Sequence, residues 1–254
     1  MRILHNPQRE EALILKVTAT LEKQREGIHA SDLLSPRLAY FRKRFPVPLS
    51  PEEVGYFATG HGHHMFLVHL ESGKKGESQE ASFFSDEYGI SYSPDIASTY
   101  TEFKTARYPQ IQKTEKARLR DFVDYAKQCL IYAICMKQTR WHLVVLYIGL
   151  RKTGPDGKYV GGLKAPVPKC WTIVFTKEEL ENGKVWLKEE VARLTTALER
   201  KSHQKLPLCD EWRCIRWNPE TRKKEPQCPY FTTKCKPAGR YEEWKEAQAE
   251  RTSK

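Results

Sequence analysis

The central stretch of the chain reads Ser93-Pro94-Asp95-Ile96-Ala97-Ser98-Thr99-Tyr100-Thr101-Glu102-Phe103-Lys104. Two alternating runs precede it, at 81–84 and 88–92, and the turn-forming residues between them predict a β-hairpin. A third strand is expected over 100–104. Helical patterns come before, between and after the strands, so the sequence predicts an α/β fold.

The same stretch carries residues suited to phosphate chemistry. Side chains alternate along a strand, so Glu102 and Lys104 share one face while Phe103 points into the core. Asp95, at the end of the preceding strand, is expected beside them. Two converging carboxylates suit a hard divalent cation, and a neighbouring lysine can orient metal-bound water. Taken alone, however, Glu-x-Lys more often marks two solvated charges on an edge strand.

Two further motifs lie on either side. Upstream, a helix is predicted to start at Ser50-Pro51-Glu52-Glu53, and it carries Gly60-His61-Gly62-His63-His64. Downstream, a helix is predicted over 115–137, with Gln128 and Tyr132 one turn apart beside its apolar stripe. The alternatives are a polar helix end or adventitious metal binder upstream, and an ordinary amphipathic boundary downstream.

As an ordered set, these motifs resemble the PD-(D/E)xK nuclease superfamily, specifically its RecB-like branch, which includes the CRISPR adaptation (Cas-type) exonucleases. The resemblance covers about 28–235. Three matches carry it: Pro94-Asp95 with Glu102-Phe103-Lys104, Gly60 with His64 in a Gly-x-x-x-His motif, and Gln128 with Tyr132 in a Gln-x-x-x-Tyr motif.

The resemblance implies a restriction-endonuclease-like core, which is a central mixed sheet flanked by helices. It also implies roles for individual residues. Mg²⁺ or Mn²⁺ would be held by His64, Asp95, Glu102 and the main-chain carbonyl of Phe103. Lys104 would position the attacking water, and Gln128 and Tyr132 would shape the cleft and meet the DNA strand.

Charge and composition agree with a polyanionic partner. Lys and Arg number 43 against 32 Asp and Glu, which gives a formal net charge of +11. No apolar run approaches the roughly 20 residues of a membrane span, and no signal peptide opens the chain, so a cytoplasmic protein without a membrane partner is expected. The predicted function is a metal-dependent DNA nuclease, an exonuclease by resemblance. Its expected partners are single-stranded DNA or duplex ends, and proteins of CRISPR adaptation or recombination. The alternative is a non-cleaving nucleic-acid-binding or adaptor protein that keeps the fold.

A proline-rich C-terminal segment holds four of the seven cysteines, which are Cys209, Cys214, Cys228 and Cys235. This segment has few apolar residues and much loop, so we expect it to need a bound metal to hold one conformation. Four thiolates suit either Zn²⁺ or an iron–sulfur cluster. The spacing fits no standard zinc ribbon.

The resemblance favours a [4Fe-4S] cluster here, because the tail of the iron–sulfur relatives is similar to the stretch from Cys228 to Cys235. Those relatives also place one cysteine near the position of Ser35 and Pro36. This chain has no cysteine at that position. We therefore expect the four C-terminal cysteines to bind a metal within the tail alone, without a ligand from the N-terminal side.

The expected organisation is an N-terminal helix (1–27), a RecB-like nuclease core (28–205), a four-cysteine module (206–240) and a charged tail (241–254). Within the core, a central strand is predicted over 141–150 and another over 170–175. A capping box at Thr176 and Glu179 should open a helix that ends near Lys201. The remaining cysteines, Cys129, Cys135 and Cys170, are expected to be buried.

Overall fold

The computed structural model describes residue 15 and the ranges 26–48, 51–72, 82–106, 123–148, 151–153, 159–163, 167–210, 214–218, 223–237 and 239–252. Most of the predicted N-terminal helix and the first part of the helix predicted over 115–137 lie outside these ranges. Within the described residues, no helix is long and apolar enough to cross a bilayer.

The chain forms two compact units, one made of 1–34 with 48–188 and the other of 35–47 with 189–254. In the first unit, one sheet has the order β1-β3-β2, with strands β1 (Ile28–His29), β3 (Ile90–Tyr92) and β2 (Phe83–Ser85). Strands β2 and β3 pair antiparallel, which confirms the predicted hairpin, while β1 runs parallel to β3. A 3-10 helix, η1 (Ala30–Leu34), follows β1.

A second sheet has the order β4-β5-β8, with strands β4 (Thr101–Ala106), β5 (Arg140–Tyr147) and β8 (Val167–Val174). β5 is central, as expected for 141–150, and pairs parallel with β4 and antiparallel with β8. The expected single central sheet is therefore wrong: the fold is mixed α/β with two three-stranded mixed sheets. Strand β4 does not extend the hairpin, because its outer edge bonds to Ile96 and Asp95.

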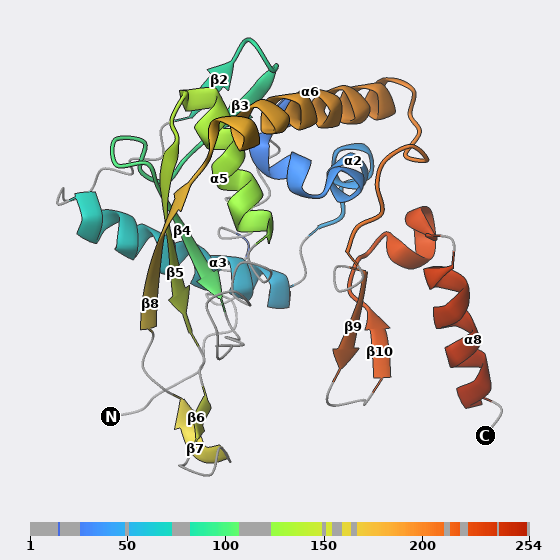
Figure 1. Ribbon diagram of the computed structural model, residues 1–254. Helices are drawn as coiled ribbons and strands as arrows, with labels where there is room; N and C mark the ends of the chain where they lie inside the picture. The colour runs from blue at the N-terminus through green and yellow to red at the C-terminus, as the bar shows by residue number, and fades with distance from the viewer. Residues whose placement is uncertain are drawn as a thin grey trace. The chain divides into compact units, whose positions relative to one another are not determined.

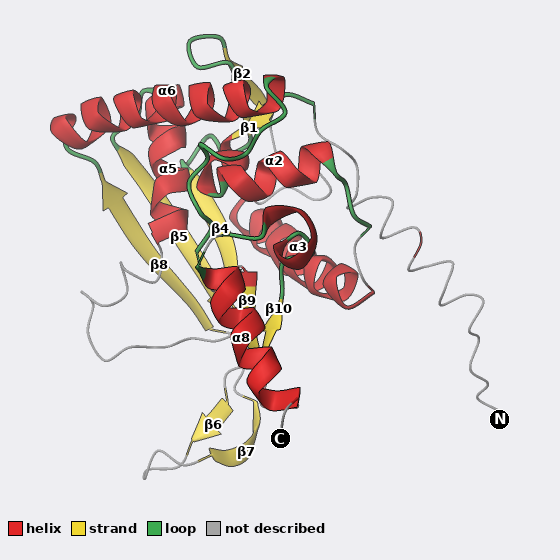
Figure 2. Cartoon of the chain, turned by 90° about the vertical axis from the view of Figure 1, so that its right-hand side faces the viewer, coloured by secondary structure: helices red, strands yellow, loops and turns green. Residues whose placement is uncertain are grey.

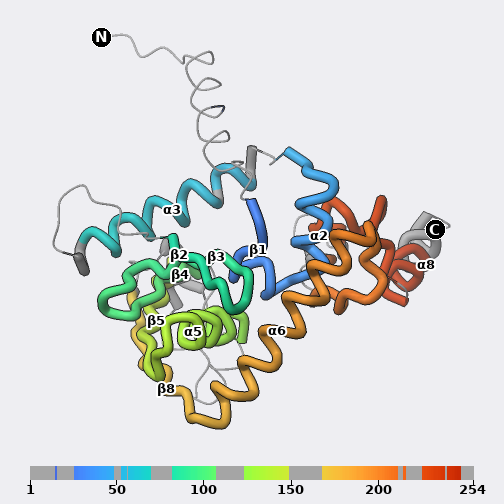
Figure 3. Tube along the Cα trace, turned by 90° about the horizontal axis from the view of Figure 1, so that it is seen from above, coloured from blue at the N-terminus to red at the C-terminus, as the bar shows by residue number. Residues whose placement is uncertain are grey.

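Helices cover both faces of the second sheet. One face packs Leu143, Val145 and Tyr147 against Tyr125 of α5 (Val123–Met136). On the other face, Phe103 packs with Ile96 and with Val68 of α3 (Pro51–Ser72), as Ser50-Pro51-Glu52-Glu53 predicted a helix there. Figure 3 shows the strands between α3 and α5, and Figure 2 shows β4, β5 and β8 running side by side. Strand β4 is thus held on both faces, which fixes the direction of its side chains.

Two short hairpins were not expected from the sequence (Figure 1). One joins β6 (Arg151–Thr153) to β7 (Tyr159–Leu163), and the other joins β9 (Ile215–Asn218) to β10 (Lys223–Pro226). The second lies in the cysteine-containing segment, where prolines gave no strand signal.

The second unit gathers segments far apart in sequence. Helix α2 (Pro36–Arg44) belongs to it with a π-helical turn, η2 (Phe231–Cys235), and α8 (Arg240–Thr252), which spans most of the expected charged tail. Phe41 stacks on Tyr230 with ring centroids 5.3 Å apart, and the Tyr230 hydroxyl donates to the Phe45 carbonyl at 2.9 Å. Aromatic packing therefore joins α2 to the cysteine-containing segment.

Helix α6 (Lys177–Glu199) begins with the predicted capping box. The Thr176 N–H donates to Glu179 Oε2 at 2.8 Å, and the Glu179 N–H donates to Thr176 Oγ1 at 3.1 Å. Two backbone donors at the start of the helix are thereby satisfied.

We expect Thr176→Ala to lower the free energy of unfolding by about 1 kcal/mol, because one of these donors loses its acceptor. Urea denaturation followed by circular dichroism measures the change. Glu178→Ala, an exposed change in the same turn, is the matched control. Equal unfolding midpoints for the two variants would mean that the cap contributes nothing.

Candidate active site

Strand β4 carries the predicted carboxylate and lysine at the edge of its sheet. Glu102 lies opposite Leu143 and Lys104 opposite Val145, so both side chains share the sheet face that α5 covers. Phe103 occupies the other face, as predicted. Lys104 Nζ forms an ion pair with Glu102 Oε1.

Asp95 is bonded to the outer edge of β4. Its Oδ2 accepts the Phe103 N–H at 2.6 Å, and only 5% of Asp95 is exposed. The Tyr100 carbonyl accepts from His142 of β5 and the Ala106 carbonyl from Ile148, just after β5, whereas Thr101 bonds to Ile96 on the opposite side. Odd-numbered residues of β4 therefore face the edge, and the Phe103 carbonyl points to the same side as its N–H.

The turn between Asp95 and β4 is conformationally unusual. Tyr100 has a φ of 53°, in the left-handed region that a bulky side chain rarely adopts. For this reason the strand begins at Thr101, not at Tyr100 as expected. The Tyr100 ring packs edge-on against Trp141 at 5.7 Å, which helps to hold this turn in place.

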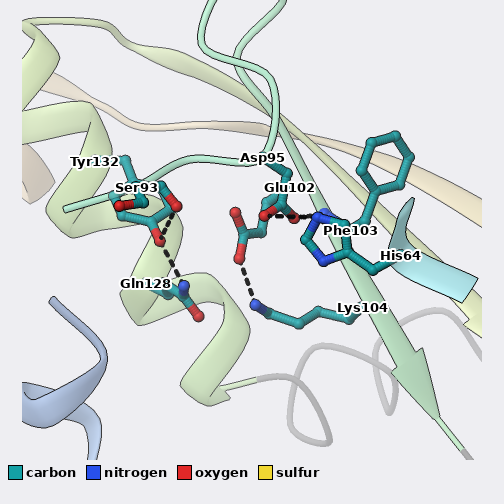
Figure 4. Close-up of polar contacts among 8 residues, drawn as sticks. All are labelled: His64, Ser93, Asp95, Glu102, Phe103, Lys104, Gln128 and Tyr132. Carbon is teal, nitrogen blue, oxygen red and sulfur yellow. Dashed lines mark hydrogen bonds and ion pairs between the residues drawn. The ribbon is translucent and has the colours of Figure 1, made fainter. Parts of the chain in front are cut away.

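Of the three clustered histidines in α3, His64 is the one that reaches the carboxylates. Its Nε2 lies 3.2 Å from Asp95 Oδ1, and its ring is 6.2 Å from that of Phe103. His63 Nδ1 instead bonds to the Thr59 carbonyl at 2.8 Å, and His61 is exposed. The helical turn thus selects one histidine for the site (Figure 4).

Glu102 is the most deeply buried acid of the group, with 1% exposure. Its Oε2 is buried and accepts no hydrogen bond from the described part of the chain. Burial raises the pKa of Glu102 to about 7; the charge of Asp95 adds to this effect, and the ion pair with Lys104 opposes it. A buried acceptor without a donor, beside a second carboxylate, marks a place where a cation is favoured.

Lys104 is held from two sides. Burial acts to lower its pKa, but the charges of Glu102 and Asp95 outweigh this and raise the pKa above its usual value. Its Nζ also lies 5.7 Å from the centre of the Tyr125 ring, within the range of a cation–π contact. Lys104 is therefore a charged donor of fixed position.

Gln128 and Tyr132 are buried and bonded within the protein. Gln128 Nε2 donates to the Tyr132 hydroxyl at 2.6 Å, which in turn donates to the Ser93 carbonyl at 3.2 Å. Figure 4 shows this chain of contacts beneath the segment that leads to Asp95. Only 2% of Tyr132 is exposed, and its bond ties α5 to the segment that leads to Asp95. The DNA contact expected of Tyr132 stays a prediction.

The side chains around Asp95, which are carboxylates and one imidazole, are of the chemical types that bind divalent metal ions. Cis ligands of an octahedral ion with bonds of roughly 2.1 Å lie about 3 Å apart. The separation of 3.2 Å between His64 Nε2 and Asp95 Oδ1 matches this spacing. Among the described residues, however, no three His, Cys, Asp or Glu side chains already form a ligand set. An ion would have to replace the present contacts of Asp95 and Glu102.

The four cysteines of the predicted module gather within the second unit. The Cys209 and Cys214 thiols share a hydrogen bond, and the Cys228 N–H donates to the Cys214 carbonyl at 3.3 Å. Electrostatic interactions link Cys214 to Cys235 and to Cys228. The hydrogen bond from Cys209 lowers the pKa of Cys214 to about 6. All four are free thiols, and as placed no three of them form a ready set of metal ligands.

The three other cysteines differ in exposure. Cys129 is buried, as expected, and Cys135 is half-buried. The expectation of burial is wrong for Cys170, which is exposed because it lies on β8, an edge strand of its sheet.

Comparisons with known proteins do not identify a family. No protein-family model and no curated protein sequence matches the chain. A crystal structure of SSO0001 matches at 17% identity and a TM-score of 0.49, over 81% of this chain and 91% of that one. A phage-related exonuclease from Haemophilus somnus 129PT matches at 9% identity and 0.44, over 69% and 96%. The alkaline exonuclease LHK-Exo from Laribacter hongkongensis matches at 12% and 0.41, over 73% and 95%.

Sequence reasoning did not find two groups that shape the site. The Ser93 carbonyl is the anchor of Tyr132, and a main-chain acceptor leaves no sequence signal. Tyr125 lies on the Gln128–Tyr132 face of α5, and helical spacing places it there, but its contact with Lys104 depends on how α5 docks on the sheet.

The pKa of Glu102 predicts how the stability of the metal-free protein depends on pH. An acid whose pKa rises on folding, here from 4.5 to about 7, stabilises the fold fully below about pH 4.5. That contribution is lost as pH rises through about 7. Glu102→Gln keeps an acceptor for Lys104 but cannot ionise. At pH 8 it should be more stable than the parent by up to about 3 kcal/mol.

Urea unfolding in the presence of a chelator, at pH 5 and pH 8, measures this effect. The advantage of Glu102→Gln should shrink at pH 5, while the exposed control Glu178→Gln should show no such trend. A variant that is less stable than the parent at pH 8 would contradict the burial of an uncompensated carboxylate.

Proposed function

We propose that this protein is a divalent-metal-dependent DNA nuclease of the RecB-like PD-(D/E)xK type, acting as an exonuclease. The observation that carries the proposal is the buried Oε2 of Glu102, which lies beside Asp95 and receives no hydrogen bond from the described residues. Burying two neighbouring carboxylates is costly unless a cation joins them. His64 and the edge-facing Phe103 carbonyl complete an oxygen and nitrogen donor set.

In this proposal Asp95, Glu102, His64 and the Phe103 carbonyl hold Mg²⁺ or Mn²⁺ against the scissile phosphate. The chemistry supplied by such an ion is stabilisation of the charge that develops on the phosphate and a lowered pKa of the attacking water. Lys104 has three N–H donors, of which Glu102 takes one, so another can orient that water.

The other residues support this arrangement. Gln128 and Tyr132 keep the Ser93 segment, and with it Asp95, in position. The net charge of +11 favours binding to the DNA backbone in single strands or at duplex ends. By its motifs the activity belongs to DNA processing in CRISPR adaptation, repair or recombination, with proteins of those systems as partners.

We expect Asp95→Asn to reduce DNA cleavage at least 100-fold with little loss of DNA affinity, because it weakens ion binding while the basic residues that contact phosphate remain. Lys104→Ala should lower turnover but keep metal affinity. The assay follows Mg²⁺-dependent digestion of linear and circular DNA, single- and double-stranded, with affinity measured separately in Ca²⁺. Asp86→Asn, in the exposed hairpin turn, is the matched control.

Cleavage of linear but not circular DNA supports exonuclease action. Full activity in Asp95→Asn would contradict the assigned site. DNA binding without cleavage in any metal would instead favour the competing function, a non-cleaving nucleic-acid-binding or adaptor protein.

We further propose that Cys209, Cys214, Cys228 and Cys235 hold a structural metal centre, a [4Fe-4S] cluster by resemblance and Zn²⁺ as the alternative. The support is the presence of four cysteines in one short segment, two of which share a hydrogen bond while a third bonds to the main chain of Cys214. As placed, they form no ready ligand set, so the thiols would reorient on binding.

Cys214→Ser should remove the metal and lower the melting temperature of the second unit first, whereas Cys170→Ser, at an exposed lone cysteine, should do neither. Anaerobically purified protein is expected to be brown, with visible absorption that bleaches on reduction. Colourless protein with one zinc per chain would replace the cluster by zinc. Protein with neither metal would remove the centre from the proposal.

A further inference from the structure

Arg37 is a buried cation at the four-cysteine cluster. It lies on α2, is 7% exposed, and donates from Nη2 to the Leu206 carbonyl at 2.6 Å. Its Nη1 lies 3.9 Å from Cys235 Sγ, a residue 198 positions away in the chain. Its Nε is buried and finds no acceptor in the described structure.

A second guanidinium lies at the same cluster. Arg240, half-buried at the start of α8, donates to the Cys209 carbonyl. It also interacts directly with the Cys214 thiol, on which Arg37 acts from a greater distance. Two arginines from opposite ends of the unit therefore converge on four thiols.

Neither arginine has a carboxylate partner in the part of the chain that the structure describes: the ion pairs found there involve other residues. A guanidinium does not lose its proton in proteins, so a buried one needs an anion nearby. Among the described residues, the group in contact with Arg37 that can carry negative charge is the Cys235 sulfur, at 3.9 Å from Nη1. Metal binding would give that sulfur its charge, because a cysteine binds a metal as the thiolate.

We propose that Arg37 and Arg240 are the counter-cations of a four-thiolate metal centre, and that Arg37 links α2 to that centre. This inference rests on the proposed metal centre. Four thiolates around a dication, or around an oxidised [4Fe-4S] core, leave two negative charges, which two guanidiniums balance.

The proposal also explains how α2 joins the C-terminal segment. Because no cysteine lies near Ser35, the sequence predicted a metal centre whose contacts are confined to the tail. Instead, α2 reaches the cluster with a guanidinium, while Phe41 stacks on Tyr230 beside it. A charge-assisted contact to sulfur thus links the two ends of the unit where a metal–sulfur bond was absent.

The test compares Arg37→Gln, Arg240→Gln and Arg37→Lys with Arg44→Gln, which changes an exposed arginine on the same helix. Each full-length protein is purified without oxygen, its iron and zinc are counted, and the rate of metal release to an excess of chelator is measured. Loss of an outer-shell partner weakens metal binding by about 10- to 100-fold, so both Gln variants should release metal faster by a factor in that range. Arg37→Lys, which keeps the charge, should retain most of the metal, and Arg44→Gln should match the parent.

The outcomes separate the two proposals. A parent protein that carries no metal overturns the four-cysteine centre and the arginine role with it. A loaded parent whose Arg37→Gln and Arg240→Gln variants release metal at the parental rate overturns the arginine role alone. Because Arg240 is only half-buried, its variant keeps the test decisive if Arg37→Gln fails to fold.

Discussion

The bond from the Phe103 N–H to Asp95 is the interaction on which the rest of the site depends. It lies at the outer edge of β4, and the described hairpin strands form a different sheet from the one that carries Glu102. The same bond orients Asp95 so that its second oxygen meets His64. One main-chain donor of β4 therefore sets the direction of a candidate metal ligand.

The carboxylates around this bond are buried in an electrostatically unfavourable arrangement. Glu102 is buried next to Asp95, and the single ion pair with Lys104 leaves one carboxylate oxygen without a donor. The packing of α5 and α3 on the two faces of the sheet prevents the side chains from turning to solvent. Functional sites are where such uncompensated charge is usually retained, because a ligand can balance it.

The second unit also buries a charged group, but there the charge is positive. Its buried guanidinium, Arg37, contacts the Cys235 sulfur and the Leu206 carbonyl, and the same helix stacks Phe41 on Tyr230. Burying a polar or charged group without a partner is unfavourable. In both units such groups are gathered at one place, and the surrounding apolar contacts hold them there.

Much of the local structure follows from the sequence alone. Alternation over the hairpin and β5, the capping box at Thr176, and the opposite faces of Glu102 and Phe103 all depend on neighbours within a few residues, so their periodicity predicts them. The sequence also placed His64, Asp95, Glu102, Lys104, Gln128 and Tyr132 as one set, although the structure leaves their catalytic roles as proposals. Tertiary structure decided the rest: that β4 forms the edge of a separate sheet, that Tyr132 faces Ser93, and that α2 brings Arg37 to the cysteines. These features depend on contacts between residues up to 198 positions apart, and no local pattern encodes which distant group will fill a given edge or balance a given charge.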